Sequence, residues 1–129
     1  AWEAALASLD PTLRRALERA AANIRRVHEA FRPEAREVTA PDGAIIGRRP
    51  DALARVGVYA PGGRATYPSS LLMGAVPARV AGVREVIVCS PPDASGAPSA
   101  VLLAAAAIAG VDRVFAVGVA GAVAAMAYG

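Results

Sequence analysis

A glycine-rich stretch after a short apolar segment is the part of this sequence best suited to binding a ligand. Tyr59 is followed by Pro61-Gly62-Gly63 and then Arg64. Adjacent glycines leave backbone N–H groups open to an anion, an arginine adds positive charge, and a tyrosine ring suits a base or a ribose. A tight turn, in which the glycines serve only geometry, is the alternative. The pattern alone favours the tight turn over ligand binding, because glycine loops are common.

A second glycine loop, Gly118-Val119-Ala120-Gly121, opens the last apolar segment of the chain. It lacks the third glycine of the dinucleotide fingerprint, and no acidic residue follows about 20 positions later. Close packing of a helix on a strand accounts for glycines at such a junction. We therefore favour a structural role for this loop.

The residues that most often carry catalysis or metals are few. His28 is the single histidine and Cys89 the single cysteine, whereas a zinc site in a protein needs at least three protein ligands. His28 lies beside the apolar seam of a predicted helix, Cys89 ends a predicted strand, and Asp93 precedes a helix as a loop or cap residue. The sequence therefore predicts no catalytic residue and no metal ligand.

The second half of the chain alternates strands with helices in a way that predicts a parallel sheet. The predicted strands are residues 55–60, 85–89 and 113–117, and the predicted helices are residues 69–81, 99–109 and 120–127. Ligands bind beyond the carboxyl ends of such strands, which is where both glycine loops fall. The strands show almost no polar alternation, so we expect both faces of the sheet to be covered. Pro77 should kink or shorten its helix.

The first half of the chain predicts a long helix followed by a hairpin. Asp10-Pro11 suits a helix start, an apolar seam then recurs every three or four residues, and Pro33 ends the pattern. Residues 36–40 and 44–47 flank a turn at residues 41–43. The predicted fold class is α/β: a partial Rossmann-like parallel sheet with flanking helices and a long N-terminal amphipathic helix. Residues 1–50 form the helix and hairpin, and residues 51–129 form a βαβαβα unit truncated at its carboxyl end.

Composition excludes several classes of protein. Of 129 residues, 55% are hydrophobic and 19% charged, which is typical of a packed domain. The net charge is +3, but the arginines are scattered without aromatic residues between them, so we predict no nucleic-acid partner. The apolar runs are too short to span a bilayer, and no signal peptide is visible. A single cysteine fits a reducing cytoplasm.

Several longer motifs resemble the histidinol dehydrogenase family. They include stretches similar to its GVYVPGG, YPSSVLM and AIPAKVAGV motifs and to its AAAAIAGVDRVYKVG and AIAALAYG motifs. The segments that match these five motifs are residues 57–63, 67–73, 75–83, 104–118 and 122–129. In addition, residues 9–30 are similar to the family's helix ahead of its nucleotide region. They occur in order along essentially the whole chain, which would cover about a third of a full family member.

This resemblance implies NAD-dependent oxidation of L-histidinol to L-histidine, in histidine biosynthesis, with zinc and a glutamate–histidine acid/base pair. Tyr59 corresponds to a tyrosine that contacts NAD, and Gly62 and Gly63 lie beside it. Gly121 stands where the family's GGAQA loop has a glutamine that also contacts NAD, and Val119 replaces a glycine of that loop. The zinc ligands and the acid/base pair lie downstream of the motif that ends at Gly129, so the resemblance assigns none of them to this chain.

Three functions follow from these observations. The first is the NAD-side segment of a histidinol dehydrogenase, inactive alone and contacting NAD weakly through Tyr59 and the glycines after it. The second is an engineered or truncated α/β fold fragment with neither activity nor ligand. The third is a self-associating module whose exposed helix seam pairs with a second copy, since members of the family work as dimers. The expected partner is thus a second copy or the missing remainder of the enzyme.

Overall fold

The fold is α/β, as the sequence predicts. The computed structural model describes residues 2–62 and 65–129. Its elements, in chain order, are α1 (Trp2–Ser8), α2 (Pro11–Ala30), β1 (Arg36–Thr39), β2 (Ile45–Arg48), β3 (Arg55–Tyr59), α3 (Pro68–Ala81), β4 (Glu85–Ser90), α4 (Ala100–Ala109), β5 (Arg113–Ala116) and α5 (Val119–Tyr128).

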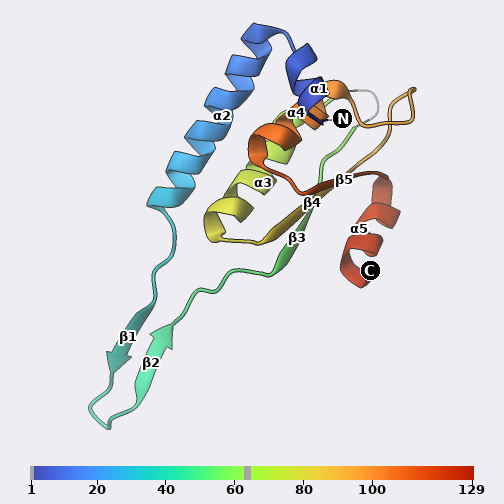
Figure 1. The fold of residues 1–129 in the computed structure, drawn as a ribbon. Coiled ribbons are helices and arrows are strands. Elements are labelled where there is room, and N and C mark those ends of the chain that lie inside the picture. The colour runs from blue at the N-terminus through green and yellow to red at the C-terminus, as the bar shows by residue number, and fades with distance from the viewer. Residues whose placement is uncertain (1, 63–64) are drawn as a thin grey trace.

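A parallel sheet in the order β3-β4-β5 forms the centre of the molecule. Helices α3 and α4 cover one face of this sheet, and α1 and α2 pack against them from outside (Figure 1). The core lies between the sheet and these helices, and its largest fully buried side chains are Leu71, Leu72, Val76, Val86, Val88 and Leu102. Burying these aliphatic side chains supplies the main stabilisation of the fold.

Local sequence signals set the ends of the helices. The Asp10 carboxylate accepts hydrogen bonds from the N–H groups of Thr12 and Leu13, which caps α2. Ser99 caps α4 in the same way by accepting from Leu102 N–H. Gly110 ends α4 with a left-handed conformation, at φ 71°, which glycine adopts without strain. Helix α1 lies outside the elements that the sequence pattern predicted.

Helix α3 does not end at Pro77: of the two effects expected of this proline, the shortening is wrong, whereas the kink remains a prediction. The helix continues through this proline to Ala81 and is capped by Gly82. A proline inside a helix costs about 3 kcal/mol because it removes one hydrogen bond and crowds the preceding turn. The buried face of α3, which includes Leu72 and Val76, outweighs this cost through contact with the core.

Helix α5 lies on the other face of the sheet and contacts β3 (Figure 1). It approaches closely because Gly57 has no side chain: a Cβ there would collide with Met126. The helix covers this face only in part, and Phe115 on β5 stays 44% exposed. The expectation that both sheet faces are covered is therefore wrong within the described residues. An apolar strand can be buried on both faces, but its composition does not show whether a helix among these 129 residues covers each face.

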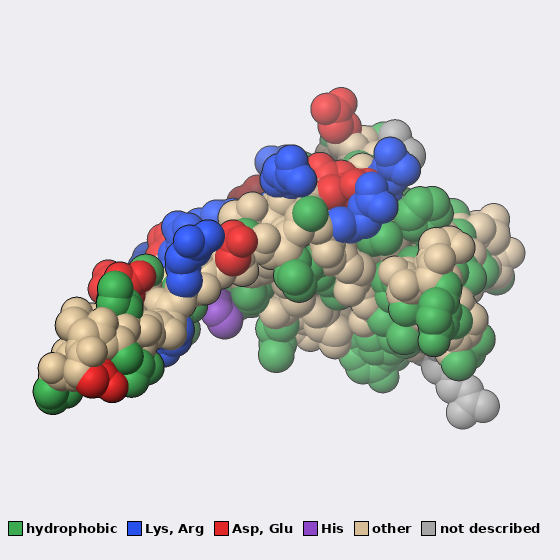
Figure 2. All heavy atoms as spheres, turned by 90° about the horizontal axis from the view of Figure 1, so that it is seen from below, with side chains coloured by type: hydrophobic (Ala, Val, Ile, Leu, Met, Phe, Trp, Pro, Cys, Tyr) green, Lys and Arg blue, Asp and Glu red, His purple; other side chains and the backbone are tan. Residues whose placement is uncertain are grey.

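Strands β1 and β2 form an antiparallel hairpin, as predicted, with Ala40 and Ala44 joined across the turn. The hairpin stands away from the rest of the molecule (Figures 1 and 2). The apolar seam of α2, which precedes the hairpin, is only partly buried. Leu17 is buried against the core, whereas Phe31 at the end of α2 is exposed. The division of the chain at residue 50 remains a prediction.

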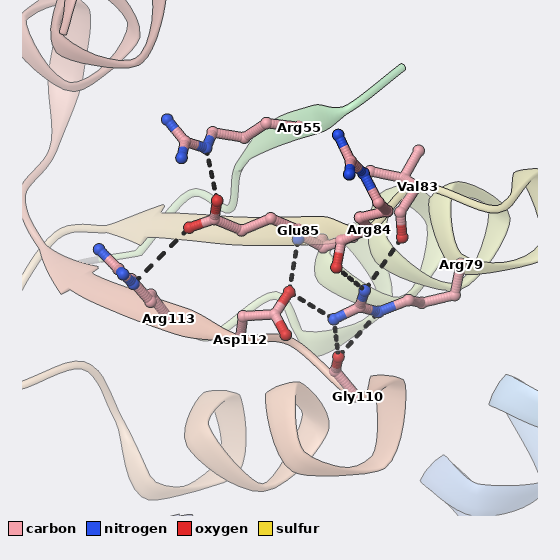
Figure 3. Close-up of polar contacts among 9 residues, drawn as sticks. Arg55, Arg79, Val83, Arg84, Glu85, Gly110, Asp112 and Arg113 are labelled. Atoms are coloured by element: carbon pink, nitrogen blue, oxygen red, sulfur yellow. Dashed lines mark hydrogen bonds and ion pairs between the residues drawn. The ribbon is translucent and has the colours of Figure 1, made fainter. Parts of the chain in front are cut away.

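A polar cluster joins several elements at the edge of the sheet where the strands begin (Figure 3). The Arg79 guanidinium on α3 donates to the carbonyls of Val83, Arg84 and Gly110, and it pairs with the Asp112 carboxylate. Asp112 also accepts from the N–H of Val86, the second residue of β4. The cluster ties the ends of α3 and α4 to the starts of β4 and β5.

Within the described ranges, no helix combines the length and the apolar character needed to cross a membrane.

Candidate functional site

The candidate site lies at the edge of the sheet where the three parallel strands end. Tyr59 is the last residue of β3 and pairs with Cys89 on β4, while Ser90 ends β4 beside Ala116 of β5. The loops that follow these strands therefore emerge side by side. This is the edge at which ligands bind in open parallel sheets.

Helix α5 and the end of β3 meet through one hydrogen bond. The N–H of Val119 donates to the Tyr59 hydroxyl oxygen at 3.2 Å. This contact links residues far apart in the sequence and holds the phenol beside the first turn of α5. A helix start carries partial positive charge, so the tyrosine lies at the positive end of the helix.

Val119 is strained in this position. Its φ is +56°, and it is the one residue other than glycine with positive φ among the described residues. A β-branched residue in the left-handed region is a genuine outlier, and its side chain is 75% exposed, so burial does not compensate. The family motif has glycine here, the residue that adopts such a φ without strain.

Pro91 is a member of the site that sequence reasoning missed. A Cβ built on Gly62 would lie 3.2 Å from the Ser90 Oγ and 3.4 Å from Pro91, and one built on Gly118 would lie 2.6 Å from the Pro91 ring. Pro91 thus lies between the loops after β3 and β5. The sequence signal that could have indicated this packing is a glycine in the loop after β3, Gly62, and another in the loop after β5, Gly118.

The two glycines of the second loop have different roles. Packing against Pro91 requires glycine at position 118, which confirms the structural role expected there. That interpretation is wrong for Gly121, because a Cβ at this position would meet no other atom within 4 Å. Gly121 is exposed, in the first turns of α5. Close packing therefore leaves Gly121 unexplained, and the position has room for a larger side chain.

Gly63 and Arg64, which the sequence suggested for anion contact, lie outside the described residues. Beyond them, Ser69 is exposed in the first turn of α3, which begins at Pro68. The Thr66 hydroxyl contacts the Ser99 hydroxyl at the start of α4, at 3.1 Å. Between these loops lies a cavity of about 20 Å³, enough for a water molecule. A ligand larger than water must therefore bind on the open surface of the edge.

The titratable residues near the site do not form a catalytic group. Burial raises the pKa of the Cys89 thiol, so this cysteine is a weak nucleophile. Hydrogen bonds from Ser95 lower the pKa of Asp93, which is a loop residue as expected. His28 is exposed on α2, beside Val27 and Met73, away from the strand ends. These three residues are not brought together.

No group of three or more histidine, cysteine, aspartate or glutamate side chains able to hold a metal ion occurs in residues 2–62 and 65–129. The residues present do not fit a zinc ion. What the edge offers instead is a half-buried tyrosine, the positive end of a helix and loops whose glycines pack closely against Pro91. This arrangement is able to bind a flat or anionic group, but among the described residues it holds no proton donor or acceptor poised for transfer.

The fold defines an α/β protein of the Rossmann-like class, with the candidate site at the ends of parallel strands. The family model described as histidinol dehydrogenase matches residues 1–129. The chain belongs to the histidinol dehydrogenase family.

Individual relatives agree with this assignment. The chain is 56% identical over 129 residues to the histidinol dehydrogenase of Bordetella parapertussis, and 53% identical over 128 residues to that of Nitrosomonas europaea. Both matches cover 99% of this chain and 29% of the relative. The crystal structure of histidinol dehydrogenase from Elizabethkingia anophelis aligns with a TM-score of 0.90 and 30% identity, over 99% of this chain and 30% of that one. The chain thus spans under a third of the length of these relatives.

Proposed function

We propose that this chain is the dinucleotide-side segment of a histidinol dehydrogenase, and that it contributes NAD contacts without the residues that oxidise the substrate. Tyr59, Gly62, Gly63 and Gly121 are the proposed contact residues. The full enzyme would oxidise L-histidinol to L-histidine with NAD and zinc, in the cytoplasm. The acid/base pair and the zinc ligands would come from polypeptide outside this chain.

One observation carries the proposal: α5 crosses to the opposite face of the sheet. Helices α3 and α4 cover one face, whereas α5 packs on β3 from the other. In an open parallel sheet such a change of face accompanies a reversal of strand order, which would fall beyond β3, and ligands bind beside such a topological switch point at the carboxyl ends of the strands. Tyr59 ends β3 at this point and is bonded to the start of α5.

Each proposed contact has a chemical role that its position permits. The Tyr59 ring offers a flat surface, and its hydroxyl already accepts one hydrogen bond. Gly62 and Gly118 allow Ser90 and Pro91 to pack closely against their loops, so a ligand would reach these loops through their backbone groups on the open surface. When bound, NAD would supply the hydride acceptor, and these residues would only hold and orient it. The site by itself is weak because Gly121 offers no side-chain amide.

Titration with NAD, followed by amide chemical shifts, tests the proposal. We expect shifts at Tyr59, Gly62 and residues 118–121, with a dissociation constant of about 1 mM or weaker. Tyr59→Phe should weaken binding several-fold, because it removes the hydroxyl that is held by Val119 N–H. Tyr128→Phe is the matched control, since this tyrosine is 91% exposed at the far end of α5.

A fold without any ligand is the second candidate, and the strained Val119 favours it. This side chain is exposed at the start of α5, where a ligand would approach. No chemical-shift change at millimolar NAD, in the wild type and in both tyrosine variants, would support this candidate and reject the first.

A further inference from the structure

The β1–β2 hairpin, residues 36–48, is an arm with no support of its own. Its two strands contact each other, and neither makes an extensive contact with another described element. Val38, Ile45 and Ile46 are 70%, 69% and 68% exposed. A two-stranded hairpin alone is marginally stable in water. The arm therefore needs a surface that these residues do not provide.

The two faces of the arm differ in chemistry. The register places Arg36 opposite Arg48 and Val38 opposite Ile46. Because side chains alternate along a strand, these four residues share one face, which we call the docking face. On the other face the Glu37 side chain lies over Gly47, and Ile45 is the single large apolar residue.

The docking face continues onto the body of the molecule. Arg36 and Arg48 line a groove of about 370 Å³ together with Phe31 and Arg32, at the carboxyl end of α2. Phe31 is 80% exposed. Figure 2 shows hydrophobic side chains on the projecting end of the molecule and arginines where it joins the body. The whole surface is thus apolar at its centre and cationic at its base.

The charges of this surface are not balanced from within. Arg32, Arg36 and Arg48 form no ion pair among residues 2–62 and 65–129. Two arginines directly opposite each other in a hairpin repel and weaken it. Glu34 is the single acidic residue that lines the groove. A complementary surface would carry carboxylates around an apolar patch, which would satisfy the arginines and bury Val38 and Ile46.

We propose that the docking face binds the part of the histidinol dehydrogenase polypeptide that lies outside this 129-residue segment. The larger part of each curated relative lies outside the match, so the full enzyme has further polypeptide that could cover this face. The solved relative contains nearly this whole fold as 30% of its chain. The inference rests on membership of the family and not on NAD binding, so each can fail without the other.

Cysteine protection tests the proposal directly. The full-length Bordetella parapertussis relative is rebuilt with this chain in place of the matching segment, and Ile46→Cys is compared with Ile45→Cys. The two positions are equally exposed in the free chain and point to opposite faces. In the free chain both cysteines should be alkylated at similar rates, while the buried Cys89 reacts slowly. In the chimera, Ile46→Cys should react at least about tenfold more slowly than Ile45→Cys.

Charge substitution gives a second measurement. Ile46→Glu should lower the thermal midpoint of the chimera by several degrees and leave the free chain unchanged, whereas Ile45→Glu should leave both unchanged. Equal alkylation of the two cysteines in the chimera would overturn the proposal. So would a chimera that fails to fold cooperatively when the parent relative does, because the docking face would then not match its partner.

Sedimentation of the free chain at two concentrations tests a second copy as the occupant. A monomer at both concentrations supports the proposal. A dimer that Ile46→Glu disrupts and Ile45→Glu does not would overturn it, because the docking face would then bind another copy of this chain.

Discussion

At the scale of single residues, the site combines one strained residue with one vacant position on the same helix. Val119 has a φ of +56° while donating its N–H to Tyr59. Gly121, two residues later, has open space around its Cβ position. The backbone strain at Val119 lowers stability, and its exposed side chain gains no packing to offset this cost. Gly121 leaves room for a side chain that could contact a ligand. Both features can be changed separately by substitution.

Val119→Gly should raise the free energy of unfolding by about 0.5 to 1 kcal/mol. Relief of left-handed strain gains about 1 to 2 kcal/mol, and the greater freedom of glycine in the unfolded chain returns part of it. The measurement is urea denaturation at constant m-value. Val123→Gly is the control: it makes the same change at a 51% exposed position inside α5, and should destabilise the protein. Destabilisation by both substitutions would contradict strain at Val119.

Gly121→Gln should tighten NAD binding about fivefold, the effect of one hydrogen bond worth about 1 kcal/mol. The side chain fits because no other atom lies within 4 Å of the Cβ position. Isothermal titration with NAD measures the effect. Gly121→Ala separates the amide from the loss of glycine, since it changes the backbone preference alone. Equal affinities of the alanine and glutamine variants would reject a cofactor contact at this position.

At the scale of elements, the two ends of the parallel strands differ in the contacts that they make. Loops with glycine and proline converge at the carboxyl ends of the strands, whereas the Arg79–Asp112 cluster fastens the other edge (Figure 3). Asp112 accepts from Val86 N–H and pairs with Arg79, and these contacts lower the pKa of its carboxyl group, the backbone bond more than the arginine.

Because its pKa is lower in the folded protein than in the unfolded chain, Asp112 adds stability above its ordinary pKa of about 3.9, and this stability is lost as the pH falls through the folded value. Asp112→Asn should therefore flatten the loss of stability between about pH 5 and pH 3. At pH 7 it should cost about 1 kcal/mol, a modest value because the side chain is 40% exposed.

Denaturation at a series of pH values measures this effect. Glu18→Gln is the control, because it removes a similarly exposed carboxylate from the single ion pair with Arg14 on α2. An acid profile of Asp112→Asn that parallels the wild type would show that the cluster is not linked to folding.

At the scale of the whole molecule, the described residues leave two surfaces unpartnered. One is the sheet face beside α5, where a groove of about 340 Å³ is lined by Phe115, Val117 and Met126. The other is the docking face of the arm. A chain that spans 29% of its relatives is expected to show such surfaces, because we propose that residues elsewhere in the full enzyme cover them. This agrees with the proposal that this chain contacts the dinucleotide, while the residues for proton transfer and metal binding lie in polypeptide outside it.

Short-range chemistry made much of the fold predictable. Asp10-Pro11 begins α2, Gly110 ends α4, and the turn at residues 41–43 joins β1 to β2, each within a few residues of its cause. Pro77 does not shorten α3, because its local cost competes with packing against residues distant in the sequence. Tyr59 and Gly62 were selected as candidates from their place at the end of a strand, and the structure places both at the carboxyl end of β3; their contact with a cofactor remains a prediction.

The sequence by itself determined the α/β rhythm, most helix ends and the family, because caps, turns and motifs are encoded in neighbouring residues. Only the tertiary structure decided that α5 changes face, that Pro91 lies between Gly62 and Gly118, and that Val119 bonds to Tyr59. These features depend on contacts between segments separated by tens of residues. Such contacts arise from the packing of the whole sheet, which no local pattern specifies.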